Sequence, residues 1–152
     1  VFDIRTLLQE TLKKYDLIFR DKGIEVELEA EQLMVAGDQA RIGQVLGNYL
    51  NNAIDHVDAL KQIRIDANRV DSRVRVSVYN SGPPIPAEAV DKIFTSFYKT
   101  DEARTRAFGG TGLGLSIVRA IMDQHRQQYG VLNQAGGVSF WFELEEANQP
   151  SD

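Results

Sequence analysis

Four glycines lie close together just before an amphipathic segment, and residues with this spacing could form a ligand site. They are Gly109, Gly110, Gly112 and Gly114, and the apolar-periodic stretch begins at Leu115. Backbone N–H groups can approach a ligand there without interference from a Cβ atom, and the free amides and positive dipole of a helix start favour phosphate. The segment is therefore a candidate phosphate cradle, with a glycine-rich hinge as the alternative. It lacks the Lys-Ser or Lys-Thr pair of a Walker loop and the third glycine of a dinucleotide fingerprint.

Asparagines interrupt the apolar pattern of a second predicted helix. Asn48 and Asn52 are four residues apart and share one face, with Asp55 and His56 one turn further along. Asparagine is a poor helix-interior residue, so three of them, Asn51 included, indicate a requirement other than helix propensity. A neutral amide oxygen suits Mg²⁺, which prefers oxygen ligands and shares its charge with substrate phosphates. A solvated face with incidental asparagines is the alternative.

A long irregular stretch, residues 80–110, precedes the phosphate cradle. It contains three prolines and scattered glycines around a short helical piece near residues 87–93. Loops of this length are uncommon in a compact domain, so we expect a functional lid. At its start, Asn80 comes straight off a predicted strand end, where a side chain can be aimed into a pocket. Taken alone, this segment is a turn.

Two aromatic residues and two cations lie within the same stretch. Phe94 and Phe97 are three apart, ahead of Lys99 and Arg104. Core packing is the alternative for the aromatics, and ordinary surface charge is the alternative for the cations. In a loop that ends in a phosphate cradle, however, cations have an anionic partner.

The periodicity of the remaining sequence predicts the elements that must position these residues. Helices are predicted over 3–20, 38–56 and 112–127, and strands over 24–29, 33–36, 63–70, 74–79, 131–133 and 138–144. Asp3 is the expected cap of the first helix, and Ile18 is expected on its packing face. Residues 145–152 are expected to form a frayed tail. Runs of strands with separated helices favour an α+β fold, a two-layer sandwich with helices on one face of a mostly antiparallel sheet.

Composition and charge narrow the possible functions. The chain is 43% hydrophobic and 26% charged, and its length fits one globular domain over residues 1–152. Its net charge of −5 disfavours bulk attraction to nucleic acid or anionic lipid, so a phosphate ligand needs a local site. Because there is no cysteine, thiolate metal sites and disulfides are excluded. We expect an intracellular location, and an anchor outside this chain if the parent protein is bound to a membrane.

Four of these segments, in their order along the chain, resemble the nucleotide boxes of sensor histidine kinases in the GHKL ATPase superfamily. Residues 48–53 resemble the N box, 80–85 the G1 box, 94–97 the F box and 110–115 the G2 box. The resemblance spans residues 38–142 and implies a Bergerat-type ATP-binding fold.

The resemblance also implies roles for particular residues. Asn52 is similar to the magnesium ligand, Asn48 to the residue that supports the phosphate end, and Lys99 and Arg104 to lid cations that steady the triphosphate. Asn80 corresponds to the residue that accepts a hydrogen bond from the adenine amino group. The other expected nucleotide contacts are Asp55, His56, Gly82, Pro84, Ile85, Phe97, Tyr98, Gly110, Thr111, Gly112, Leu113, Gly114 and Leu115.

The sequence departs from the family pattern at the adenine loop and at the end of the asparagine helix. Asn80 stands where the family usually has aspartate, and its amide oxygen accepts a hydrogen bond with less charge assistance. Pro84 stands where glycine is usual, and proline fixes φ near −65°. Asp55 and His56 stand where a basic or small residue and an aromatic are common. For both, flanking the nucleotide and lying on a plain exposed helix end remain alternatives.

The function implied is transfer of the γ-phosphate of Mg-ATP to a histidine on a separate dimerisation domain. The ATP-hydrolysing members of the superfamily carry a glutamate as general base where this chain has Asn48, so ATP should be spared from water. A hydrolysing switch and a nucleotide-binding pseudokinase are the rival interpretations. The expected partners are the chain's own acceptor-histidine domain and a response regulator, with no nucleic acid. We expect this domain to be monomeric, within a homodimeric and membrane-anchored sensor whose catalytic part is cytoplasmic.

Overall fold

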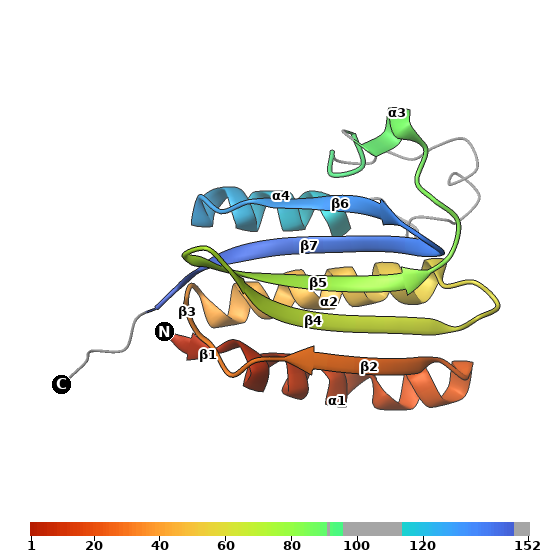
Figure 1. Cartoon of the computed structure of the whole chain (residues 1–152), viewed down its shortest axis with the longest axis horizontal. Helices are drawn as coiled ribbons and strands as arrows, with labels where there is room; N and C mark the ends of the chain where they lie inside the picture. Colours follow the sequence, from red (N-terminus) through yellow and green to blue (C-terminus); the bar gives the residue numbers. More distant parts are fainter. Residues whose placement is uncertain (91, 96–113, 148–152) are drawn as a thin grey trace.

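The computed structural model describes residues 1–90, 92–95 and 114–147, and the three long helices lie on one face of a seven-stranded sheet (Figure 1). Along the chain, the elements are β1 (Phe2–Asp3), α1 (Ile4–Lys22), β2 (Glu25–Ala30), β3 (Met34–Ala36), α2 (Gln39–His56), β4 (Gln62–Val70), β5 (Arg73–Ser81), α3 (Ala87–Val90), α4 (Gly114–His125), β6 (Tyr129–Gln134) and β7 (Gly137–Glu146). This two-layer arrangement confirms the predicted fold class.

The sheet has the strand order β1-β3-β7-β5-β4-β2, and β6 pairs with β7. Only β2 and β4 are parallel neighbours in the described sheet, because the chain crosses between them through α2. One edge of β7 pairs with β5, while its other edge pairs first with β6 and then with β3. Because β5 and β7 are antiparallel, Asn80 at the end of β5 lies opposite Val138 at the start of β7.

Local signals set the ends of the first two long helices. Asp3 caps α1 by accepting a hydrogen bond from the Arg5 amide at 2.9 Å, and the helix ends at Gly23, whose φ of 68° is left-handed. Asp38 caps α2 in the same way, accepting from the Arg41 amide at 3.2 Å. The predicted starts of both helices are therefore confirmed.

The apolar face of α2 forms the middle of the core. Figure 1 shows α2 between α1 and α4, against the centre of the sheet. Its buried face includes Ile42, Leu46 and Tyr49, and the Tyr49 hydroxyl donates to the Trp141 carbonyl at 2.9 Å. Each such side chain contributes about 1.5–3 kcal/mol by leaving water. Asn52 lies on the same buried face, which makes it a polar exception in an apolar seam.

Several predicted boundaries were wrong. The expected frayed tail begins too early, because Glu145 and Glu146 belong to β7 and pair with β3; residues 148–152 lie outside the described residues. Helix α4 ends at His125 instead of residue 127, since Arg126 takes a left-handed φ of 57°. Ile18 was expected to pack but is 40% exposed. The structure also adds β1, which the sequence did not predict.

None of the helices in the described part of the chain is long and apolar enough to cross a membrane.

Candidate nucleotide-binding site

Helix α2 carries two side-chain amides whose nitrogen atoms the core leaves without partners. Asn52 is only 7% exposed, and Asn48 is partly buried. The Nδ2 atoms of both are buried and have no hydrogen-bond partner among the residues that the structure describes. A buried amide without a partner costs about 1–3 kcal/mol, so these two atoms call for a ligand or for a segment outside the described residues.

Asn48 on α2 and the start of α4, which were both predicted to lie at the phosphate end, are close together in the structure. The side chain of Asn48 lies beside Gly114, the first residue of α4, because a Cβ atom at Gly114 would lie 3.8 Å from Asn48 Oδ1. The start of α4 therefore faces the asparagine ridge, and a helix start carries free amides and a positive dipole. Leu115, next along, is buried in the core and so anchors this start.

The end of β5 places Asn80 next to the end of α2. Asn80 is 2% exposed, and its Nδ2 donates to the Ser81 carbonyl at 3.1 Å, which leaves Oδ1 as the acceptor of this amide. Gly82 packs against the last residue of α2, since a Cβ atom there would lie 2.8 Å from the His56 carbonyl oxygen. Glycine at position 82 is therefore required by close approach. The structure thus brings His56, Asn80 and Gly82 together.

His56 is a neutral group in this setting. Burial lowers the pKa of His56 from 6.5 to about 4, because the charged imidazolium loses its hydration. A neutral imidazole can flank a flat ligand but adds no positive charge for phosphate. Its neighbour Asp55 is exposed, which agrees with a position on the outer side of the helix end.

The other histidine has a structural role. His125 Nε2 accepts a hydrogen bond from the Asp38 amide at 3.0 Å, and Nδ1 lies 2.8 Å from the Ile121 carbonyl oxygen. Through these two contacts the ring joins the end of α4 to the start of α2. His125 is 11 residues from Gly114, about 16 Å along a helix, and so lies far from the candidate phosphate end.

Ile85 and Phe94 are both core residues, whereas Pro84 is exposed. The Phe94 ring meets Tyr129 edge-on at 5.0 Å between centroids and lies 6.1 Å from Phe140. The structure therefore supports core packing, one of the two interpretations of Phe94. Eight expected site residues lie outside the described residues: Phe97, Tyr98, Lys99, Arg104, Gly110, Thr111, Gly112 and Leu113.

Sequence reasoning assigned nothing to Asn133 on β6, whose side chain makes two hydrogen bonds to the backbone of Ile85. A single asparagine in a short strand carries no local signal of such a contact, because the two residues are 48 apart in sequence.

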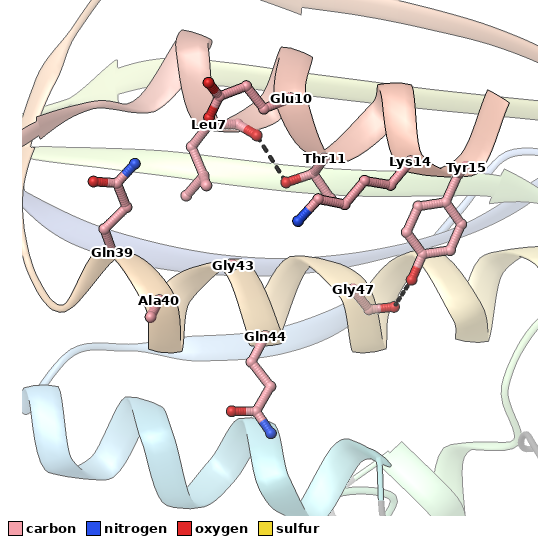
Figure 2. Close-up of a pocket in the computed structure, with 10 residues that line it drawn as sticks. All are labelled: Leu7, Glu10, Thr11, Lys14, Tyr15, Gln39, Ala40, Gly43, Gln44 and Gly47. Carbon is pink, nitrogen blue, oxygen red and sulfur yellow. Dashed lines mark hydrogen bonds between the residues drawn. The ribbon is translucent and has the colours of Figure 1, made fainter.

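A groove of about 820 Å³ lies elsewhere on the molecule, between α1 and α2 (Figure 2). It opens where Ala40, Gly43 and Gly47 leave α2 without large side chains. Figure 2 shows its two internal hydrogen bonds, from Thr11 to the Leu7 carbonyl and from Tyr15 to the Gly47 carbonyl. None of the expected nucleotide residues lines it. In the described ranges, no group of three or more His, Cys, Asp or Glu residues could hold a metal ion, so a magnesium ion here would need phosphate oxygens and water besides an amide oxygen.

The chain is similar to proteins of a known family. Residues 37–148 match the family model described as histidine kinase-, DNA gyrase B-, and HSP90-like ATPase. The chain is 33% identical over 132 residues to the sensor histidine kinase CusS of Escherichia coli O157:H7. The matched stretch covers 87% of this chain and 27% of CusS. This chain therefore spans about a quarter of the length of that curated relative.

Solved structures give the same result for the fold. The catalytic domain of histidine kinase ThkA, in a nucleotide-free form, is 38% identical with a TM-score of 0.85, over 95% of this chain and 93% of that one. ThkA in complex with response regulator protein TrrA is also similar, at 32% identity and a TM-score of 0.77, over 96% and 41% of the two chains. Full-length ShkA in complex with AMPPNP is 30% identical with a TM-score of 0.84, over 99% and 31%. The chain therefore belongs to the histidine kinase-, DNA gyrase B- and HSP90-like ATPase family, and its fold is that of a histidine kinase catalytic domain.

Proposed function

We propose that this chain binds Mg-ATP and transfers the γ-phosphate to a histidine on a separate domain, as the catalytic part of a sensor histidine kinase. The observation that carries the proposal is that the Nδ2 atoms of Asn48 and Asn52 are buried and have no hydrogen-bond partner among the described residues. Buried polar groups in native proteins are nearly always hydrogen-bonded, so two unpaired groups side by side on one helix are expected where a ligand binds them. The complex of the similar kinase ShkA with AMPPNP supports an adenine nucleotide as that ligand.

The residues fit the two ends of a nucleotide. Asn52 would hold Mg²⁺ through its amide oxygen, with Asn48 and the free amides at the start of α4 directed to the phosphates. A bound Mg²⁺ supplies positive charge that offsets the charge carried by the phosphate oxygens during transfer. At the other end, Asn80 would accept a hydrogen bond from the adenine amino group, with Gly82 and His56 beside it. In the segment outside the described residues, we assign Lys99 and Arg104 to the triphosphate, together with the glycines at 110 and 112.

The choice of transfer over hydrolysis depends on Asn48. An amide cannot take a proton from water at neutral pH, so a water molecule beside it is not activated by a general base at this position. ATP would then persist until an imidazole from another domain reaches the γ-phosphorus in line with the leaving oxygen. A hydrolysing switch would need a base that this position does not supply.

The proposal extends to the whole protein. Its partners would be its own acceptor-histidine domain and a response regulator, as in the complex of the similar kinase ThkA with TrrA. We propose a homodimeric, membrane-anchored sensor whose catalytic part faces the cytoplasm. The similar protein CusS is named a sensor histidine kinase, which supports the sensor role.

Isothermal titration with ATP, in the presence and absence of Mg²⁺, tests the proposal. Wild type should bind more tightly with Mg²⁺, and Asn52→Ala should lose that Mg²⁺-dependent gain. Asn51→Ala is the matched control, because Asn51 is the adjacent residue on α2 but is exposed. A folded Asn52→Ala variant with unchanged Mg-ATP affinity would overturn the magnesium assignment, and a wild type that binds no ATP would overturn the function itself.

A further inference from the structure

The segment that follows Asn80 has few backbone groups with which to hold its shape. Residues 83, 84 and 86 are prolines, which have no N–H. Between positions 82 and 86, only Gly82 and Ile85 can therefore donate a backbone hydrogen bond. Where these two donors go decides how the segment is fixed.

Both donors go to the β6–β7 hairpin. The Gly82 amide donates to the Gly136 carbonyl at 3.0 Å, and the Ile85 amide donates to Asn133 Oδ1 at 2.9 Å. Asn133 Nδ2 then donates back to the Ile85 carbonyl at 3.0 Å. The Asn133 side chain thus pairs with both the N–H and the carbonyl of Ile85, as the backbone of a neighbouring strand would. In Figure 1, the chain leaving β5 passes the end of this hairpin before it reaches α3.

The same hairpin end also packs tightly against the strand that carries Asn80. Gly137 lies so close to β5 that a Cβ atom there would overlap the Asn80 carbonyl oxygen. The Tyr79 hydroxyl donates to the Ala135 carbonyl at 3.4 Å. Since the hairpin is fixed against β5, the two hydrogen bonds of Asn133 transmit that fixed position to Ile85 and to the prolines on either side of it.

We infer that Asn133 is a positioning residue that sets the shape of the 82–86 loop, and through it the affinity for the adenine end of the nucleotide. The inference rests on the proposed function, because the loop is assigned to adenine there. Asn133 acts through Ile85 and needs no contact with the ligand. Its effect should therefore be felt by adenosine and by ATP alike, and not by the phosphates alone.

A purely local role for Asn133 within the hairpin is not what its contacts show. The neighbouring residue Gln134 has that role, since its Oε1 accepts from the Ser139 hydroxyl across β6 and β7 at 2.8 Å. Both Asn133 and Gln134 are exposed polar residues of the same strand. Gln134→Ala is thus a matched control that removes a hydrogen bond within the hairpin and leaves the loop contact in place.

Titrations of the wild type, Asn133→Ala and Gln134→Ala with adenosine, ATP and inorganic tripolyphosphate test the inference. Asn133→Ala should weaken adenosine and ATP by a similar factor, roughly tenfold for two net hydrogen bonds, and leave tripolyphosphate unchanged. Gln134→Ala should stay within about twofold of wild type for all three ligands. Hydrogen exchange provides a readout without nucleotide, because the Ile85 amide should exchange faster in Asn133→Ala only.

The outcomes are distinct. Unchanged adenosine affinity in Asn133→Ala, with wild-type binding intact, would overturn the positioning role alone. Equal losses in Asn133→Ala and Gln134→Ala, or an equal loss of tripolyphosphate, would also overturn it by indicating general damage to the hairpin. A wild type that binds neither adenosine nor ATP would refute the proposed function, and with it the role assigned to the loop, even if the exchange of Ile85 responds as expected.

Discussion

Replacing Asn52 by leucine should make the ligand-free domain more stable while it removes nucleotide binding. The side chain is 7% exposed, and its Nδ2 has no hydrogen-bond partner among the described residues. A buried polar group without a partner costs about 1–3 kcal/mol, and leucine is the better helix former by roughly 0.5 kcal/mol. Leucine has the same number of side-chain heavy atoms and the same branch point at Cγ, so it can take the position of the amide. We therefore expect the free energy of unfolding to rise by about 1–3 kcal/mol.

Thermal unfolding with and without Mg-ATP measures both effects in one experiment. At roughly 2–4 °C per kcal/mol for a domain of this size, the ligand-free Asn52→Leu variant should melt about 2–12 °C above wild type. A ligand present at 100 times its Kd stabilises the folded state by about 2.7 kcal/mol. Mg-ATP should therefore raise the Tm of the wild type and leave that of the variant unchanged.

Asn51→Leu is the matched control for this experiment. It makes the same substitution at the adjacent, exposed position of α2, so it gains helix propensity without removing a buried amide. It should keep the nucleotide-dependent rise in Tm. A ligand-free Asn52→Leu variant that melts below wild type would show that Asn52 serves the fold, and a retained response to Mg-ATP would show that it does not serve the ligand.

Three further predictions follow from the structure. Asn80→Asp should keep or strengthen adenosine binding, because a carboxylate is the better acceptor; a large loss in titration would contradict the assignment. The pKa of His56 is lowered from its ordinary 6.5 to about 4 in the folded chain. As the pH falls, the imidazole is therefore protonated in the unfolded chain before it is protonated in the folded chain. The stability present above pH 6.5 should therefore fall as the pH drops towards 4, by up to about 2 kcal/mol at pH 5; denaturant titrations of His56→Gln should lack this component, and an equal loss in the variant would refute it. Gly137→Ala should destabilise the fold by about 1–3 kcal/mol in denaturant titration, because its Cβ would lie 2.6 Å from the Tyr79 ring; wild-type stability would contradict the packing.

Local patterns predicted most of the elements and part of the site. Asp3 and Gly23 bound α1 through contacts within a few residues, and such signals can be read from the sequence. The asparagine ridge was visible because Asn48 and Asn52 break an apolar helical period. The contact of Asn48 with Gly114 could be expected only from the order of the segments and the resemblance, since no local rule joins α2 to α4.

The errors arose where a residue depends on a distant partner. Glu145 and Glu146 are acidic and near the end of the chain, which is typical of a tail, but β3 lies more than 100 residues earlier and pairs with them. Similarly, the imidazole of His125 at the end of α4 bonds to the Asp38 amide 87 residues away. The contact of Asn133 with Ile85 spans 48 residues. Amphipathic period and cap rules contain no information on such pairs.

Phosphate transfer in trans tests the central claim most directly. The chain would be incubated with γ-labelled ATP, Mg²⁺ and a separate acceptor-histidine domain from a similar sensor kinase, and the label on each protein would be counted. We predict acid-labile label on the acceptor and none on this chain, because His125 is bonded on both ring nitrogens and His56 lies on α2 itself, the helix assigned to the nucleotide. Stoichiometric label on this chain, lost in His56→Gln or His125→Gln, or rapid release of phosphate to water without transfer, would contradict the account.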